Sequence, residues 1–233
     1  MMEYSADMFW PITDLVLTNF SHAAYYTLVN LKSFLPGDTN YICIDVGAHR
    51  CETTIELLEQ NKTGVIIAFE PIPILYKQLL FRHPRLIALP FAIDVTTSIS
   101  PFHLTAFDAC SSLLDFTSEG LGIWNDDKSL AVVSTYHVQT IRLDTVLLTL
   151  PYVDYLKIDT QGNDFNVIVS AGDLIKKVKR IKTEAVVTEH QLYSGAHTKE
   201  EVTNYLSCYG FELVESVAQT WDRELDLYFE RKI

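Results

Sequence analysis

Short apolar runs alternate with segments of helical periodicity through most of the chain, and this alternation constrains the fold more than any other feature. The run YICIDV (41–46) leads through a glycine turn to the helical segment ETTIELLEQ (52–60). VIIAF (65–69) leads to residues 72–79, whose apolar side chains share one helical face. Strands that are joined by helices pair in parallel, with the helices packed on the sheet. The sequence therefore predicts an α/β fold with a mostly parallel sheet and helices on both faces.

Five further apolar runs predict five further strands. Only seven residues separate the last two runs, too few for a helical crossover, so these runs should form an antiparallel hairpin. A capping box of Thr198 and Glu201 predicts a helix that ends at Gly210. The five runs are residues 86–93, 154–158, 181–189, 211–217 and 225–230.

The whole chain, residues 1–233, is expected to form one domain, because no repeat or low-complexity tract divides it. An N-terminal helical extension (1–38) would cap the main core (41–231). Residues 94–136 lack strong periodicity, and no strand or helix is assigned to them. Part of that stretch, 111–130, suits either a lid that orders when a ligand binds or an ordinary connection.

The charge balance narrows the classes of partner. With 18 basic and 30 acidic residues the net charge is −12, which disfavours binding to a nucleic-acid backbone. The first twenty residues carry no basic n-region, and polar residues and a proline interrupt their apolar positions, so neither secretion nor a membrane anchor is expected. The four cysteines show no zinc-type spacing, which favours a reducing, cytoplasmic location without disulfides. The oligomeric state stays open, and a homo-oligomer is compatible with the composition.

Acidic residues end three of the predicted strands: Asp45, Glu70 and Asp159. In an open parallel sheet, ligands bind beyond the carboxyl ends of the strands, so the three should face one site. A glycine turn after the first strand and a carboxylate after the second fit either a dinucleotide or an adenosyl group. The turn has one glycine rather than GxGxxG, and Asp45 stands where a pyrophosphate would bind. The pattern favours a ligand with a positive end, such as S-adenosylmethionine, and leaves a nucleotide-dependent oxidoreductase as the alternative.

Six sequence blocks, in this order, resemble the FkbM family of methyltransferases. They are DVGAHRCETT, AFEPIP, SSLL, TIRLDT, YLKIDTQG and a late TE…LYSG…GFEL, within residues 41–230. The resemblance implies a Rossmann-like class I methyltransferase fold, with a seven-stranded sheet whose last strand is antiparallel. It also implies an S-adenosylmethionine-dependent O-methyltransferase that acts on a hydroxyl of a sugar or glycoconjugate. A polyketide-like or other small metabolite is the alternative acceptor.

Carried over by position, the resemblance implies a site for S-adenosylmethionine. Asp45, Gly47 and Ala48 would line its methionine part, and Glu70 would accept hydrogen bonds from the ribose hydroxyls. Pro71 would lie against the adenosine together with the residue that follows it. The full set of implied cofactor-binding residues is Asp45, Gly47, Ala48, His49, Glu70, Pro71, Ile72, Ala92, Ser111, Ser112 and Asp159.

An alcohol acceptor must lose a proton, and a general base is therefore expected. The candidate catalytic residues are Asp159, which matches the acidic position of the family's KIDxEG block, Glu184 on the penultimate parallel strand, and His190 in the loop after it. A neutral imidazole could accept the proton near pH 7, and His137 is a weaker candidate of the same type. In an alternative, Asp159, Glu184 and Glu189 hold a divalent cation that orients a diol. The preferred interpretation includes no metal.

Two positions depart from the family pattern. Cys51 stands where a glycine is usual, and its Cβ is expected to crowd the turn. Gln161 stands where a glutamate is usual, so the negative charge of that position is lost. These departures leave a non-catalytic binding module as a third interpretation.

Overall fold

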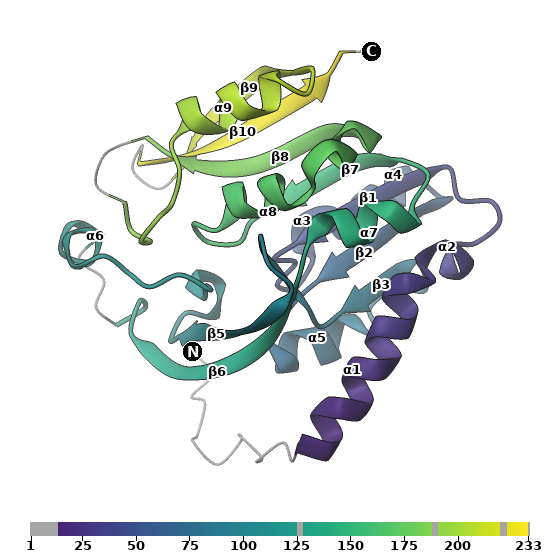
Figure 1. Ribbon diagram of the computed structural model, residues 1–233, viewed down its shortest axis with the longest axis horizontal. Helices are drawn as coiled ribbons and strands as arrows, with labels where there is room; N and C mark the ends of the chain where they lie inside the picture. Colours follow the sequence, from purple (N-terminus) through teal and green to yellow (C-terminus); the bar gives the residue numbers. More distant parts are fainter. Residues whose placement is uncertain (1–13, 125–127, 188–190, 220–222, 233) are drawn as a thin grey trace.

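A computed structural model describes residues 14–124, 128–187, 191–219 and 223–232. Seven strands form its central sheet: β1 (Tyr41–Val46), β2 (Gly64–Phe69), β3 (Leu86–Leu89), β7 (Val153–Ile158), β8 (Val178–Val186), β9 (Phe211–Gln219) and β10 (Glu224–Arg231). Their order across the sheet is β3-β2-β1-β7-β8-β10-β9 (Figure 1). All neighbours pair in parallel except β10, which runs antiparallel to both β8 and β9. The predicted seven-stranded sheet with an antiparallel last strand is confirmed.

Successive side chains of a strand point to opposite faces of the sheet, and both faces carry helices. Ile42, Ile44 and Val46 of β1 face one apolar core, whereas Cys43 faces a second. Helices α1 (Asp14–Val29), α2 (Leu31–Phe34), α7 (Leu143–Thr149), α8 (Asp164–Ser170) and α9 (Lys199–Ser207) contribute to the first core, and α3 (Glu52–Ile55), α4 (Leu57–Gln60) and α5 (Pro73–Leu79) to the second. The sheet is thus the middle layer of three (Figure 1).

Several predicted helix boundaries are present. Thr198 and Glu201 form the reciprocal capping box at the start of α9, and Gly210 follows that helix with a φ of +84°. The N-terminal extension forms two helices, and Leu28 and Leu31 are fully buried in the same core as the sheet. Residues 52–60 form two short helices rather than the single predicted one.

A second, smaller sheet lies beside the first, and most of it falls in the stretch 94–136, to which no strand or helix was assigned. It consists of β4 (Ala92–Ile93), β5 (Ser98–Thr105) and β6 (Val132–Ile141), in the order β4-β6-β5. Apolar and polar residues alternate in only part of β5 and β6: Phe102 and Val138 are buried, whereas most other side chains of the two strands are at least partly exposed. The strand predicted for 86–93, with a bend marked by its proline, is interrupted at Pro90, which has no N–H to donate. It forms two strands instead of one, β3 of the large sheet and β4 of the small one. The 3-10 helix η2 (Asp108–Cys110) and helix α6 (Ser118–Trp124) follow β5.

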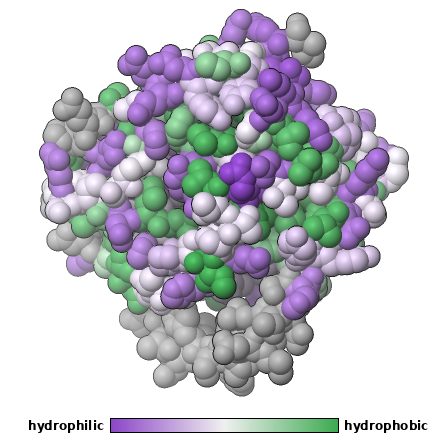
Figure 2. Space-filling view, viewed as in Figure 1, coloured by the Kyte–Doolittle hydropathy of each residue, from purple (hydrophilic) through white to green (hydrophobic). Residues whose placement is uncertain are grey.

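The surface combines hydrophilic and apolar residues, which are interspersed over the face seen in Figure 2. Several aromatic side chains are exposed, and Phe81 at the end of α5 is 91% accessible. Among the helices that the structure describes, none is long and apolar enough to cross a membrane.

Candidate active site

A pocket opens beyond the carboxyl ends of β1, β2 and β7. The turn after β1, the residues after β2, the loop after β7 and the segment around η2 form its walls. We call it the donor pocket. Eight of the predicted cofactor-binding residues line it: Gly47, His49, Glu70, Pro71, Ile72, Ala92, Ser111 and Asp159. Ends of strands that lie far apart in the sequence thus meet at one place, as expected for a parallel sheet.

Gly47 allows two of these strand ends to come together. Its φ is +70°, a conformation that L side chains rarely adopt, and its N–H bonds to the carbonyl of Phe69 at 3.1 Å. A Cβ at this position would lie 1.9 Å from the backbone oxygen of Asp159. The close approach of the β1 turn to the end of β7 therefore requires glycine.

Glu70 is an almost fully buried carboxyl in the wall of the donor pocket, with 3% of its surface accessible. Its two oxygens accept hydrogen bonds from the backbone N–H groups of His49 and Ile72, each at 2.7 Å. Burial raises the pKa of Glu70 to about 8, although the two N–H groups act in the opposite direction. Glu70 therefore titrates close to neutral pH and retains acceptor capacity for ligand hydroxyls.

Asp45 lies behind the donor pocket rather than in its wall. It is fully buried, and its carboxylate accepts a hydrogen bond from Thr54 Oγ1 at 2.5 Å and pairs with Lys157 Nζ at 3.2 Å. The predicted direct contact with a bound cofactor is not supported by this position. The reason is the alternation of side chains along β1: Asp45 and Cys43 point to the side of the sheet that α3 and α4 cover.

Two other predicted residues also lie outside the pocket lining. Ala48 packs in the core beneath α3 and α4. Ser112 Oγ donates to the backbone oxygen of Gln161 at 2.7 Å and accepts from the N–H of Leu114 at 3.1 Å. Ser112 therefore holds the segment after η2 against the loop after β7, while its neighbour Ser111 reaches the pocket.

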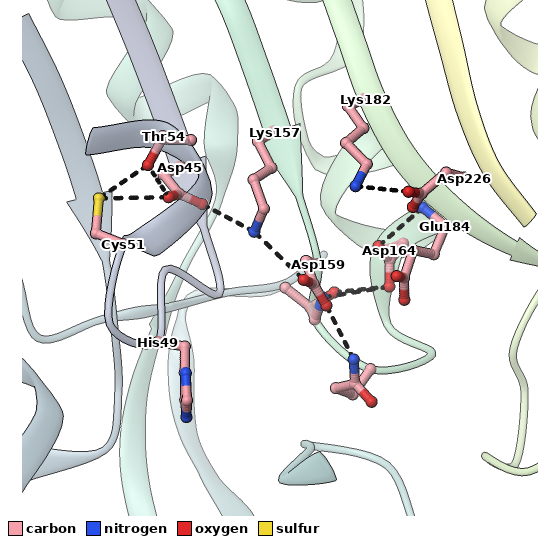
Figure 3. Close-up of polar contacts among 12 residues, drawn as sticks. Asp45, His49, Cys51, Thr54, Lys157, Asp159, Asp164, Lys182, Glu184 and Asp226 are labelled. Atoms are coloured by element: carbon pink, nitrogen blue, oxygen red, sulfur yellow. Dashed lines mark hydrogen bonds and ion pairs between the residues drawn. The ribbon is translucent and has the colours of Figure 1, made fainter. Parts of the chain in front are cut away.

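Asp159 is the carboxylate that faces the pocket at the end of β7, with 33% of its side chain accessible. Lys157 Nζ lies 3.3 Å from one of its oxygens, and Gln161 Nε2 donates to the other at 2.9 Å. Lys157 stands between Asp45 and Asp159 (Figure 3). Burial would raise the pKa of Asp159, but the Lys157 ammonium and the Gln161 amide outweigh it and lower that pKa. Asp159 is thus held as an anion.

The three predicted catalytic residues do not share one pocket. Glu184 lines a separate pocket of about 290 Å³ together with Asp164 and Glu224. Burial and mutual repulsion raise the pKa of all three carboxyls, that of Asp164 to about 6 and that of Glu224 to about 7. His190 and Glu189 lie outside the residues that the structure describes. Among the described residues, no three acidic, histidine or cysteine side chains are arranged to hold a metal ion.

Sequence reasoning missed a polar cluster at the pocket. Asp108 of η2 lines it, and its carboxylate pairs with Arg50 Nη2 at 2.8 Å and lies 2.9 Å from His49 Nε2. Burial opposes ionisation of Asp108, but the Arg50 and His49 contacts lower its pKa. Asp108 falls in the stretch without periodicity, so the sequence offered no signal for it. Lys157 did offer one, since a lysine inside an apolar run requires a buried partner.

Cys51, which stands where the family usually has a glycine, adopts a backbone conformation that favours glycine. Cys51 is 1% exposed and adopts a φ of +56°, the left-handed region that favours glycine. Its Sγ lies 2.9 Å from Thr54 Oγ1, within the group around Asp45. The left-handed conformation of a cysteine carries a conformational cost, and the crowding by its Cβ stays a prediction.

Comparison with known proteins identifies the family of this chain. The family model of the methyltransferase FkbM domain matches residues 45–213, most of the chain. A search of curated protein sequences gave no match.

Among solved structures, the chain is similar to a TehB-like SAM-dependent methyltransferase from Corynebacterium glutamicum, with 11% identity, a TM-score of 0.45 and coverage of 93% of this chain and 94% of that one. It is also similar to 1,6-didemethyltoxoflavin-N1-methyltransferase from Burkholderia thailandensis, with 10% identity, a TM-score of 0.45 and coverage of 100% and 93%. For mitomycin 7-O-methyltransferase the identity is 12%, the TM-score 0.44 and the coverage 95% of this chain and 58% of that chain. The assignment rests on the family model: the chain belongs to the FkbM methyltransferase family, whose enzymes use S-adenosylmethionine.

Proposed function

We propose that this methyltransferase transfers the methyl group of S-adenosylmethionine to a hydroxyl of a sugar or glycoconjugate. The observation that carries the proposal is the donor pocket, in which buried Glu70 and the anion of Asp159 line the same cavity. A polyketide-like or other small metabolite is the second candidate acceptor. The sugar is preferred because the family commonly modifies such hydroxyls.

The chemistry of the pocket lining fits the donor. Ile72, Phe91 and Phe102 supply apolar surface for an adenine ring. Glu70 can accept hydrogen bonds from ribose hydroxyls, and Asp159 can face a positive ammonium or sulfonium group. Asp159, which is held as an anion in the lining, would repel the pyrophosphate of a dinucleotide. The lining therefore favours a methyl donor over the oxidoreductase alternative.

The donor supplies a methyl group that is already activated by its positive sulfur, so the protein has to orient the acceptor and accept its proton. Orientation contributes about 7–11 kcal/mol in well-aligned systems, and a general base about 10²–10⁴-fold. Asp159 has a lowered pKa, which supports an electrostatic role rather than that of a base. Glu184 has a raised pKa and lies in the neighbouring pocket, so Glu184 and His190 stay the proposed bases.

Calorimetry tests the proposal at the level of the donor. We expect S-adenosylmethionine and S-adenosylhomocysteine to bind, and NAD not to bind. Binding of NAD instead would indicate an oxidoreductase, and binding of none of the three would indicate a non-catalytic module.

A screen with tritiated methyl donor tests the acceptor. Glycans, lipids and small metabolites are offered separately, and we expect label in the glycan fraction. Label confined to small metabolites would replace the sugar by the second candidate. Retained activity after dialysis against EDTA would argue against the divalent cation.

The compartment, the domain organisation and the oligomeric state are proposals as well. The four cysteines are all free, which supports a reducing compartment, and we propose the cytoplasm. We also keep one methyltransferase domain over residues 1–233, in which the two N-terminal helices share the core of the sheet. A homo-oligomer stays open to measurement.

A further inference from the structure

Gln161 links the carboxylate of the donor pocket to a buried tyrosine. It lines the pocket in the loop after β7, with a φ of +56°. Its Nε2 donates to Asp159 Oδ1 at 2.9 Å, and its Oε1 accepts from the hydroxyl of Tyr193 at 3.0 Å. One side chain therefore acts as donor on one side and as acceptor on the other.

The polarity of this link is determined by its partners. A carboxylate can only accept hydrogen bonds, and Lys157 holds Asp159 in that form, so the amide nitrogen must face Asp159. The amide oxygen then faces Tyr193, whose hydroxyl can donate. An amide satisfies both contacts at every pH, whereas a glutamate can donate to Asp159 only while it is protonated.

Tyr193 is a rigid partner. Its ring is 1% exposed and lies 5.1 Å from the ring of Phe116. It also packs on Gly162, where a Cβ would come within 2.5 Å of the Tyr193 side chain. The single hydroxyl proton of Tyr193 is shared between Gln161 Oε1 at 3.0 Å and the carbonyl oxygen of Cys110 at 2.9 Å. Gln161 thus connects Asp159 to a part of the molecule that cannot shift easily.

We infer that Gln161 is a positioning residue, which holds Asp159 in the donor pocket and, by being an amide rather than a carboxylate, allows Asp159 to stay ionised there. The inference rests on the proposed binding of S-adenosylmethionine in this pocket. It also assigns a purpose to the position at which this chain departs from the family pattern.

The surroundings of Asp159 explain why a carboxylate at position 161 would change the ionisation of Asp159. Lys157 and Lys182 attract the Asp159 carboxylate. Three carboxyls interact with Asp159 from α8, β8 and β10: Asp164, Glu184 and Glu224. Glu70 and Asp108 line the same pocket as Asp159, and Asp45 pairs with the same lysine. Among the described residues, His49 and Tyr193 are two further titratable groups nearby. Two carboxylates in direct contact inside this set would share one proton.

Calorimetric titration with S-adenosylmethionine between pH 6 and 9 tests the inference with Gln161→Met, Gln161→Glu and Tyr193→Phe. The Gln161→Met variant loses both bonds, and we expect about ten-fold weaker binding, by the same factor at every pH, since a bond to a charged acceptor is lost. In Gln161→Glu the shared proton is released when the cationic donor binds. The ratio of its Kd to that of the wild type should therefore fall about ten-fold as the pH rises from 6 to 9. Tyr193→Phe keeps the buried ring, and we expect about three-fold weaker binding without a change in pH dependence.

The Kd of each variant is divided by the Kd of the wild type at the same pH. This ratio removes the effect of the titration of Glu70, which the wild type and all variants share. Gln78→Glu, on the exposed side of α5, is the matched control for an added charge, and its ratio should stay near one throughout. If the Kd ratio of Gln161→Glu is constant within two-fold between pH 6 and 9, or equals the ratio of Gln78→Glu, the inference is overturned.

The two proposals fail in different ways. A wild type that does not bind S-adenosylmethionine overturns the proposed function. A wild type that binds it, with Gln161 variants that bind equally well at all pH values, overturns the inference alone. Thermal unfolding shows which variants are folded, and if Gln161→Met is not folded, the Gln161→Glu ratio decides.

Discussion

At the scale of single residues, a buried lysine forms ion pairs with two carboxylates at the end of the sheet. Lys157 has 6% of its side chain accessible and lies 3.2 Å from Asp45 and 3.3 Å from Asp159. Burial would lower the pKa of Lys157, but the two carboxylates raise it, so its charge is retained. The lysine compensates the buried charge of Asp45 and orients the exposed charge of Asp159.

Replacing Lys157 by methionine should strongly destabilise the protein, because it leaves Asp45 as an uncompensated buried charge. We expect the free energy of unfolding in urea to fall by about 3–5 kcal/mol. The matched control is Lys232→Met, whose lysine and its partner Glu212 are both 62% accessible, with an expected loss below about 1 kcal/mol. Equal losses in the two variants would contradict the role assigned to Lys157.

Gly47 gives a second residue-scale prediction. Gly47→Ala places a Cβ 1.9 Å from the Asp159 carbonyl oxygen and requires a left-handed alanine. We expect a loss of about 2 kcal/mol or more in unfolding free energy, and at least about ten-fold weaker donor binding because the pocket wall must shift. Gly37→Ala, where nothing lies within 4 Å of the added Cβ, should leave both measurements unchanged.

The titration of Glu70 predicts a pH dependence of donor binding. Ribose hydroxyls donate to a carboxylate better than to a carboxyl, so the affinity for S-adenosylhomocysteine should rise as the pH increases through about 8. Folding has the opposite sign: the unfolded chain ionises Glu70 near pH 4.5, so its contribution to stability declines between about pH 4.5 and 8. Glu70→Gln should remove the pH dependence of binding in calorimetry between pH 6.5 and 9. A dependence that persists in this variant would assign the titration to another group.

At the scale of elements, the pocket is built by two sheets rather than one. The large sheet supplies the strand ends with Glu70 and Asp159, and the small sheet supplies a wall through Ala92 of β4 and Phe102 of β5. The segment after η2 completes this wall and is bonded to the loop before α9, for example between the N–H of Thr117 and the carbonyl of Leu192 at 2.8 Å. The part of 111–130 that the structure describes is therefore tied to the core, and its ordering by a ligand stays a prediction.

Phe102 tests the contribution of the small sheet. It is 6% exposed, packs with Ile72 and Leu75, and lies 5.7 Å from the ring of Tyr136. Phe102→Ala should lower the free energy of unfolding in urea by about 3 kcal/mol and weaken donor binding, because the wall loses its aromatic surface. In Phe81→Ala, whose ring is 91% accessible, neither quantity should change. Intact donor binding in a folded Phe102→Ala variant would show that the small sheet does not shape the site.

At the scale of the whole molecule, the charge distribution limits the partners. The net charge is −12, and carboxyls line both the donor pocket and the neighbouring one. Such a field repels polyanions over distances up to about 10 Å at 0.1 M salt and favours neutral or cationic acceptors.

The charge predicts that nucleic acid is not a partner. We expect no increase in the fluorescence anisotropy of labelled duplex DNA or RNA at 0.15 M salt, with or without S-adenosylhomocysteine, because few phosphate contacts can form. A basic DNA-binding protein serves as the positive control. Micromolar binding of either duplex would contradict the acceptor class proposed above.

How far the sequence determines the fold depends on burial. The strands of the large sheet were predictable because their runs are buried on both faces or alternate in polarity, as in β2 with all six residues buried. The hairpin of β9 and β10 was predictable from its short connection. Strands β5 and β6 were not predicted, because Pro101 interrupts the alternation in β5 and most side chains of both strands are at least partly exposed.

The same division applies to the site. The sequence by itself determined that Gly47, Glu70 and Asp159 meet, because residues that follow parallel strands share one edge of a sheet. Only the tertiary structure decided that Asp45 turns away to Lys157, that Asp108 joins the pocket, and that Gln161 contacts Tyr193. The physical reason is that chain order sets which strand ends come together, whereas the direction of a side chain and its partners depend on packing against residues that are distant in the sequence.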